Sequence, residues 1–265
     1  MKIKEIVSAL ERFAPLPLQD GFDNAGLQIG LTEVEATGAL LCLDVTEAVL
    51  DEAIALGHNL VISHHPLIFK GYKSITGKDY VERCILKAIK NDIVIYSAHT
   101  NLDNAYGGVN YKIAEKIGLK NLQVLEPKEN SLQDDLMQAG AGIVGELDEP
   151  ETELEFLKRI KKTFEVGCVR HNRLTGREIQ KVALCGGAGA FLLPQAIRAG
   201  ADVFITGEIK YHDYFGHEGD ILMAEIGHYE SEQYTKEIFY SIIRDLFPNF
   251  ALQLSKINTN PIKYL

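Results

Sequence analysis

Two stretches of this chain repeat one another, and each alternates short apolar runs with helical patterns. The apolar residues 182–185 line up with the apolar residues 40–42, so that Cys185 matches Cys42 at an offset of 143 positions. An offset that stays constant across strand, helix and strand indicates an internal duplication. The next pair of apolar runs, 93–98 and 221–226, requires an offset of 128, so the connections differ in length. The offset of 143 also relates Gly200 to Gly57, Ile205 to Ile62 and Thr206 to Ser63.

Hydrophobic periodicity predicts the elements of the first copy. Apolar residues at helical spacing from Ile3 to Phe13 predict a helix that is stopped by Pro15 and Pro17. Buried strands are predicted over 40–44, 59–63 and 93–98, with helices over 46–56 and about 78–91. Strands that alternate with helices form parallel sheets. We therefore expect an α/β fold of duplicated α/β units whose strand ends surround a shared, metal-containing cleft.

A polar stretch separates the two copies. Residues from Glu126 to Gln138 break the hydrophobic periodicity just before the small residues 139–142. This predicts a first α/β half over 1–127, a short junction over 128–138 and a second α/β half over 139–265. The junction is also where an insertion would be tolerated.

Charge and composition exclude several classes of protein. A formal net charge of −10 argues against binding to nucleic acid or to anionic lipid, because both attract basic patches. We find neither an apolar run of ~18 residues nor the apolar region of a signal peptide, so we expect a cytoplasmic protein without membrane association. The four cysteines show no CxxC spacing and are interpreted as reduced core residues, not as zinc ligands or disulfides.

Ligand-type side chains stand where three of the apolar runs end. His64 and His65 follow the second strand, Asp103 follows the third, and His228 and Glu232 follow the run 221–226. Each group has a structural alternative: the histidine pair could close a strand, Asp103 could form a turn, and Glu232 could favour a helix start. Because all three groups are of ligand type and lie at strand ends, their coincidence favours a metal centre.

The number and chemistry of these groups indicate the kind of metal site. Three imidazoles, two carboxylates and no thiolate differ from a closed structural zinc site. They fit two ions at the ~3.5–4 Å separation of paired hydrolytic metals, and zinc, iron(II) and manganese all suit the set. We expect hydrolytic chemistry, with His99, Glu208 and His212 as neighbours that could move protons. For Glu208 and His212, a solvated charged loop remains the alternative.

The glycine-rich stretch 186–190 has two interpretations. It follows the strand 182–185 and precedes a predicted helix, so its backbone N–H groups could approach a phosphate. A tight strand-to-helix turn is the favoured interpretation and phosphate contact the secondary one, since the spacing is neither that of a dinucleotide fingerprint nor that of a P-loop.

Several motifs in order resemble the GTP cyclohydrolase I type 2 homologue family, also called the NGG-one interacting factor three-like family. The resemblance implies two mixed sheets, a dinuclear divalent-metal site and a ring-shaped homohexamer. It places the family's metal ligands on the same five residues, His64, His65, Asp103, His228 and Glu232. Phe22 stands where many members have tryptophan, and longer members carry an additional domain at the junction. The motifs are Phe22–Gln28, Ser63–Pro66, His99–Asp103, Thr206–His212, Gly227–Glu232 and Asn258–Ile262.

The family name implies a reaction as well as a metal site. Activated water would attack GTP at C8, open the purine ring and release formate, so the expected partner is a small-molecule nucleotide substrate. Two alternatives remain at this point. The chain could be a metal-binding interaction or scaffold protein, or it could hydrolyse other or damaged nucleotides with the same ligands.

Overall fold

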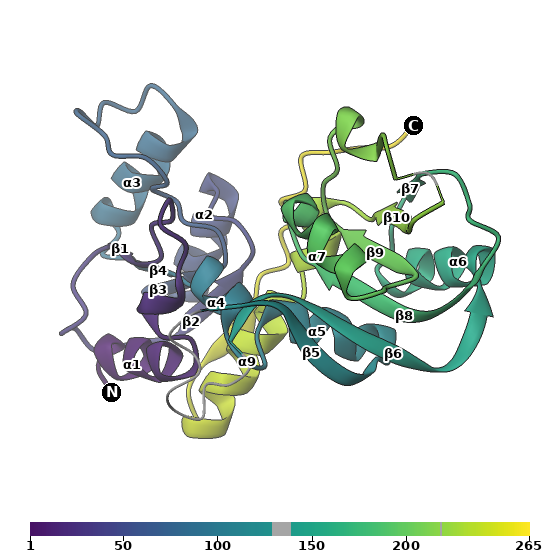
Figure 1. The fold of residues 1–265 in the computed structure, drawn as a ribbon. Coiled ribbons are helices and arrows are strands. Elements are labelled where there is room, and N and C mark those ends of the chain that lie inside the picture. Colours follow the sequence, from purple (N-terminus) through teal and green to yellow (C-terminus); the bar gives the residue numbers. More distant parts are fainter. Residues whose placement is uncertain (129–138, 218) are drawn as a thin grey trace. The chain divides into compact units, whose positions relative to one another are not determined.

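The computed structural model describes residues 1–128, 139–217 and 219–265, which fold into two compact α/β units (Figure 1). Unit 1 consists of Met1–Leu102 and Thr235–Pro261, and unit 2 of Asp103–Tyr234 and Ile262–Leu265. Each unit contains one mixed sheet, which confirms the expected α/β class with two mixed sheets. None of the helices in the described part of the chain combines the length and apolar character needed to cross a membrane.

The sheet of unit 1 has five strands in the order β1-β4-β3-β2-β11. Strands β2 (Ala39–Cys42), β3 (Leu60–Ser63), β4 (Val94–Ser97) and β11 (Leu252–Leu254) are parallel, and β1 (Gly26–Ile29) runs antiparallel to β4. Helices α2 (Glu47–Leu56) and α3 (Tyr80–Lys90) pack on one face with alternate side chains of the strands. Helices α1 (Ile3–Phe13) and α9 (Thr235–Leu246) pack together, and α9 contacts β2 and β11. With apolar partners on both faces, β2, β3 and β4 are fully buried and show no polar alternation.

The sheet of unit 2 has six strands in the order β5-β6-β8-β9-β10-β7. Strands β8 (Glu178–Cys185), β9 (Val203–Thr206) and β10 (Leu222–Glu225) are parallel. Strands β5 (Lys120–Pro127), β6 (Gly140–Thr152) and β7 (Arg170–His171) pair antiparallel. Helix α7 (Leu193–Arg198) contributes to the core on one face, and α5 (Val109–Ile117) and α6 (Glu153–Thr163) contact β6 and β8. The short helix α4 (Thr100–Asn104) contains the division between the units, and α8 (His228–Glu232) follows β10.

The strand registers reproduce the repeat found in the sequence. Cys42 pairs with Ser63 as Cys185 pairs with Thr206, so both pairs keep the offset of 143. Strand β10 and helix α8 lie 128 positions after β4 and α4, which extends the repeat through the short helix that follows the third strand. Gly57 and Gly200 both adopt positive φ, 67° and 70°, at the turn after the repeated helix, a conformation that favours glycine.

The structure corrects one expectation and leaves another untested. Cys42, Cys84 and Cys185 are buried, but Cys168 is exposed, so the assignment of all four cysteines to the core is wrong for Cys168. All of the predicted junction except Lys128 lies outside the described residues. The halves 1–127 and 139–265 stay a prediction about the repeat, while the compact units combine segments from both of them.

Candidate metal centre

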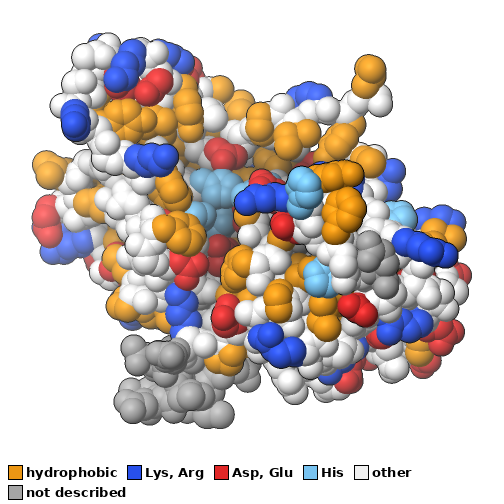
Figure 2. All heavy atoms as spheres, turned by 45° about the horizontal axis from the view of Figure 1, so that its top comes forward, with side chains coloured by type: hydrophobic (Ala, Val, Ile, Leu, Met, Phe, Trp, Pro, Cys, Tyr) orange, Lys and Arg blue, Asp and Glu red, His pale blue; other side chains and the backbone are white. Residues whose placement is uncertain are grey.

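Histidine side chains, pale blue in Figure 2, lie at several places on this face, and some of them gather near hydrophobic and acidic side chains. In unit 1, a group of three histidines begins where β3 ends. The N–H groups of His64 and His65 both donate to the carbonyl of Leu43, at 3.2 and 3.0 Å, so the chain turns away after Ser63. Because both histidines lie beyond the strand, the rule that successive strand residues face opposite sides does not separate them. Their ring centroids are 4.9 Å apart.

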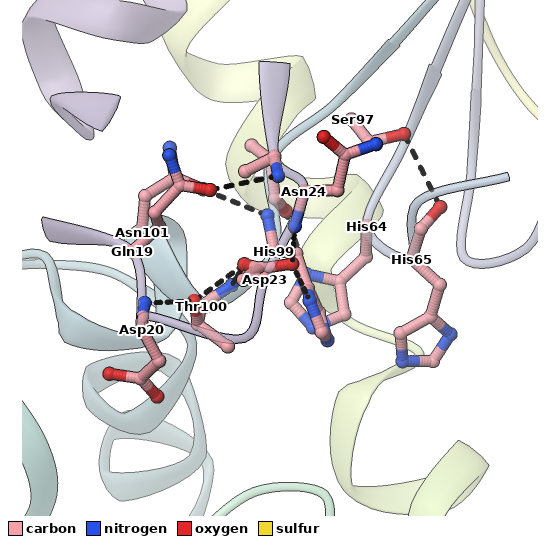
Figure 3. Close-up of polar contacts among 12 residues, drawn as sticks. Gln19, Asp20, Asp23, Asn24, His64, His65, Ser97, His99, Thr100 and Asn101 are labelled. Carbon is pink, nitrogen blue, oxygen red and sulfur yellow. Dashed lines mark hydrogen bonds and ion pairs between the residues drawn. The ribbon is translucent and has the colours of Figure 1, made fainter. Parts of the chain in front are cut away.

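A third imidazole joins this pair from the end of β4. The ring of His99 lies 5.3 Å from that of His64 and 5.5 Å from that of His65 (Figure 3). One nitrogen from each of the three rings lies within 4.8 Å of the other two, so the group could hold a metal ion. His99 was predicted as a proton-moving neighbour, and the structure places it against the two predicted ligands of unit 1.

Each of these rings has its Nδ1 atom occupied by an oxygen. His64 Nδ1 lies 2.9 Å from the carbonyl of Ala98, His65 Nδ1 lies 2.7 Å from Asp44, and His99 Nδ1 lies 2.7 Å from Asp23. A carbonyl or an ionised carboxylate only accepts hydrogen bonds, so we assign the proton to Nδ1 in all three rings. In a neutral ring this leaves Nε2 with its lone pair, as metal-binding histidines require.

The two carboxylates that hold these rings are themselves fixed in the ionised form. Burial of Asp23 raises its pKa, but hydrogen bonds from His99 and Thr100 outweigh this effect and lower the pKa to about 2. Burial likewise opposes ionisation of Asp44, and the hydrogen bonds from His65 and Thr259 outweigh it, so its pKa is also lowered. Sequence reasoning missed Asp23, Asp44 and Thr259 as supporting residues. Asp23 and Thr259 lie in the motifs 22–28 and 258–262, and Asp44 stands at the carboxyl end of a strand, so each had a signal.

Unit 2 brings together His228, Glu232 and Glu208. His228 Nε2 lies 3.1 Å from Glu232, as the spacing of four on a helix predicts, and His228 Nδ1 lies 2.7 Å from Glu208. Gly187 leaves room for the carboxylate of Glu232 in this position, because a Cβ at Gly187 would lie 2.3 Å from Glu232 Oε1. The pattern of unit 1 recurs here: a carboxylate occupies Nδ1 and orients the ring.

Of the other two predicted site residues of unit 2, Asp103 has a carboxylate oxygen within 4.8 Å of one of Glu232, whereas His212 lies among aromatic rings at the surface. Asp103 lies in α4, where its backbone carbonyl accepts a hydrogen bond from Asn110 at 3.0 Å. His212 is exposed, and its ring contacts Tyr211 and Phe215, with centroids 5.2 and 6.1 Å away. The structure therefore connects Glu208 directly to a predicted ligand, whereas His212 belongs to a surface group of aromatic rings.

The glycine-rich loop after β8 is a tight turn whose amides are already in use. The N–H groups of Gly186, Gly187 and Gly189 donate to side-chain oxygens at 2.9–3.0 Å. The acceptors are Asn110, Ser231 and Thr206. These bonds favour the structural reading of the loop over phosphate binding, and the loop supports α8, which carries His228 and Glu232.

The fold and these groups define the class of protein: an α/β protein with two mixed sheets and groups of histidine and acidic residues that could hold metal ions. The chain belongs to the Duf34/NIF3 (NGG1p interacting factor 3) family, whose profile matches residues 1–261.

Named relatives and solved structures support this assignment. A protein of Clostridium perfringens called GTP cyclohydrolase 1 type 2 homolog is 38% identical over 235 residues, which cover 88% of this chain and 87% of the relative. The crystal structure of a hypothetical protein of Staphylococcus aureus matches with a TM-score of 0.89 and 32% identity, over 100% of this chain and 99% of that chain. A Bacillus cereus protein related to NIF3 matches with the same TM-score at 27% identity and the same coverage.

Proposed function

We propose that His64, His65, Asp103, His228 and Glu232 hold two divalent metal ions and that the protein is a metal-dependent hydrolase. The observation that carries the proposal is the occupation of Nδ1 by an oxygen in each of the three proposed histidine ligands, which orients the ring for binding through Nε2. The donor set of imidazoles and carboxylates suits zinc, iron(II) or manganese. Relatives named as GTP cyclohydrolase homologues make GTP the first substrate to test.

Paired divalent ions supply acidified water and an electrophilic clamp for anionic or carbonyl oxygens. The chain's own residues would orient the histidine ligands and transfer protons. Asp44 and Glu208 keep a proton on Nδ1 of His65 and His228 and so hold these rings in one orientation. His99, fixed in the same way by Asp23, is the candidate to accept or deliver a proton through Nε2. On GTP, one water would open the imidazole ring at C8 to leave a formamide, and a second water would hydrolyse that formamide and release formate.

The test combines metal analysis with turnover. Purified protein is loaded with zinc, iron(II) or manganese, its metal content is measured, and GTP is added while formate and ring-opened product are followed. We expect two ions per chain and formate release that His64→Ala abolishes. His171→Ala removes an exposed histidine whose Nδ1 atom lies 2.7 Å from the neighbouring Asn172 carbonyl, and it should leave metal content and turnover unchanged.

Two outcomes would contradict parts of this proposal. Absence of bound metal, or metal binding that His64→Ala does not reduce, would remove the ligand assignment. Two bound ions without turnover of GTP or of other nucleotides would remove the hydrolase and favour a metal-binding interaction protein.

We also propose a homohexamer, which rests on the family resemblance. Light scattering coupled to size exclusion should then give six times the chain mass of 29.4 kDa. A mass of one or two chains would remove this proposal and leave the metal assignment untouched.

A further inference from the structure

Two phenylalanine side chains of unit 1 contact each other while both remain exposed to solvent. Phe22 is 66% exposed and Phe69 is 45% exposed, and their ring centroids are 6.3 Å apart at an interplanar angle of 47°. Single exposed apolar side chains are ordinary, but contacting aromatic rings beside a polar site call for an explanation. We call Phe22 and Phe69 the phenylalanine pair.

The backbone on both sides of the phenylalanine pair is tied in place. Asn24 Nδ2 donates to the carbonyl of Ile68 at 2.6 Å, and Gln28 Oε1 accepts from the N–H of Ile68 at 3.2 Å. Asp23, next to Phe22, accepts hydrogen bonds from His99 and Thr100. The loop of Phe22 and the loop of Phe69 are therefore linked by polar contacts, and the two rings are held at the surface by those contacts.

The phenylalanine pair adjoins the imidazoles. Phe69 meets the ring of His99 edge-on, with centroids 6.2 Å apart at 77°. His99 in turn contacts His64 and His65. A flat ring bound against Phe22 or Phe69 would therefore lie beside the group that we propose to bind metal and move protons.

We propose that Phe22 and Phe69 form a stacking subsite for the planar heteroaromatic ring of the substrate. The inference rests on the proposed function, because it assigns a substrate class to the same site: a compound that carries a flat ring of the nucleobase kind next to the bond that reacts. Stacking of a base on an aromatic side chain tolerates any base, since every base has a π-face. The phenylalanine pair would thus select for a ring and leave the choice among rings to other contacts.

The test is a binding measurement on the full metal-loaded chain, with GTP, ATP, UTP and inorganic tripolyphosphate as probes. Tripolyphosphate carries the anionic chain without a base. We expect Phe22→Ala and Phe69→Ala to weaken binding of the nucleotides by roughly tenfold or more and to leave tripolyphosphate unchanged. Phe22→Trp should retain nucleotide binding, and Phe22→Leu, which is apolar but not aromatic, should behave like Phe22→Ala.

Controls separate stacking from damage to the fold. Leu31→Ala removes another exposed apolar side chain of unit 1, 73% exposed, and should leave every affinity unchanged. Thermal melting and metal content are measured for each variant, so that a variant with altered folding is recognised before its affinity is interpreted. Phe22→Trp and Phe22→Leu keep the test decisive if an alanine variant fails to fold.

Three results would overturn the proposal. Nucleotides could bind the unaltered protein no more tightly than tripolyphosphate, or the variants could lose affinity for both kinds of probe equally. Variants that change the oligomer mass would make the phenylalanine pair a contact between copies.

Failure of the hydrolase proposal would give a different result. Base-dependent binding that needs the phenylalanine pair, without formate release, would keep the subsite and remove the reaction. Turnover that needs His64 but not Phe22 or Phe69 would keep the reaction and remove the stacking subsite.

Discussion

At the scale of single residues, the proposed ligands are defined by what holds their rings. An isolated imidazole can bind a metal ion through either nitrogen. A neighbour that accepts a hydrogen bond from one nitrogen leaves the other nitrogen to bind the metal. For His65 that neighbour is Asp44, whose second oxygen accepts from Thr259 of the C-terminal segment. Asp44 lies 21 positions from His65 and 215 positions from Thr259 along the chain, so the orientation of the His65 ring depends on residues distant in sequence.

Replacing Asp44 tests this dependence. Asp44→Asn removes the charged acceptor from His65 Nδ1, and we expect metal affinity to fall by about 10–100-fold, as for other carboxylates that orient metal-binding histidines. Competition with a chelator of known affinity measures the change. Asp51→Asn is the matched control, because Asp51 pairs with Lys87 at the surface. Equal affinities for Asp44→Asn and the unaltered protein would show that Asp44 does not position a ligand.

At the scale of elements, two helix starts depend on carboxylate contacts. In the first turn of α3, Glu82 accepts hydrogen bonds from the segment that precedes the helix. The donors are the N–H groups of Thr76 and Lys78, at 2.8 and 3.1 Å, and the Thr76 hydroxyl. Its side chain is fully buried, and burial raises its pKa. The hydrogen bonds outweigh that effect and lower the pKa to about 2 from the ordinary 4.5.

The lowered pKa of Glu82 predicts a pH-dependent stability. A carboxylate with a lower pKa in the folded state stabilises it fully above the unfolded pKa, so this contribution is complete above about pH 4.5 and is lost as pH falls towards 2. Glu82→Gln should lower the free energy of unfolding at pH 7, and the difference from the unaltered protein should shrink between pH 4.5 and 2. Urea titrations at several pH values measure it. Glu115→Gln, at an exposed pair with Lys112, should show neither effect, and a difference that stays constant with pH would contradict the assignment.

The start of α6 offers a second, smaller test. Thr152 is the N-cap, its hydroxyl accepts from the N–H of Glu155, and the Glu155 carboxylate accepts from the N–H of Thr152. Loss of this reciprocal cap in Thr152→Ala should destabilise the protein by about 1 kcal/mol. Thr163→Ala, at the other end of the same helix, should change stability by less than about 0.5 kcal/mol. Equal urea midpoints for Thr152→Ala and the unaltered protein would exclude the cap as a contributor.

At the scale of the whole molecule, the units do not follow the order of the chain. Helix α9 and strand β11 come from the C-terminal part of the sequence and complete unit 1, where β11 pairs with β2 and α9 packs on α1. Phe239 and Ile243 of α9 are fully buried. The stability of the first sheet therefore depends on residues about 200 positions away from it.

Because α9 belongs to unit 1, we expect a substitution in α9 to destabilise unit 1 more than unit 2. Phe239→Ala should destabilise the protein by about 3–5 kcal/mol, because it empties a closely packed site. Hydrogen exchange should accelerate in β2 and β3 of unit 1 more than in β8 and β9 of unit 2. The neighbouring Tyr240→Ala, at a partly exposed position, is the control. Faster exchange confined to β8 and β9 would show that α9 supports the other unit.

The sequence predicted the elements better than their assembly. The helix over 3–13 is observed over the same residues, and the predicted strand 59–63 differs from β3 by one residue, because apolar periodicity is a local property. The offsets of 143 and 128 reappear in the strand registers. The support of Asp44 by Thr259, and the place of α9 in unit 1, could not be read in the same way, since nothing local to either partner specifies the other.

By itself, then, the sequence determined the α/β class, the repeat and the residue types available at the strand ends, because side-chain periodicity and chain order are both written along the chain. The tertiary structure decided which oxygen occupies each imidazole Nδ1, that Phe22 meets Phe69, and that the C-terminal helix and strand complete the N-terminal unit. The physical reason is distance along the chain: hydrogen bonds and ring contacts act over a few ångströms in space, and folding alone brings such distant residues within that range.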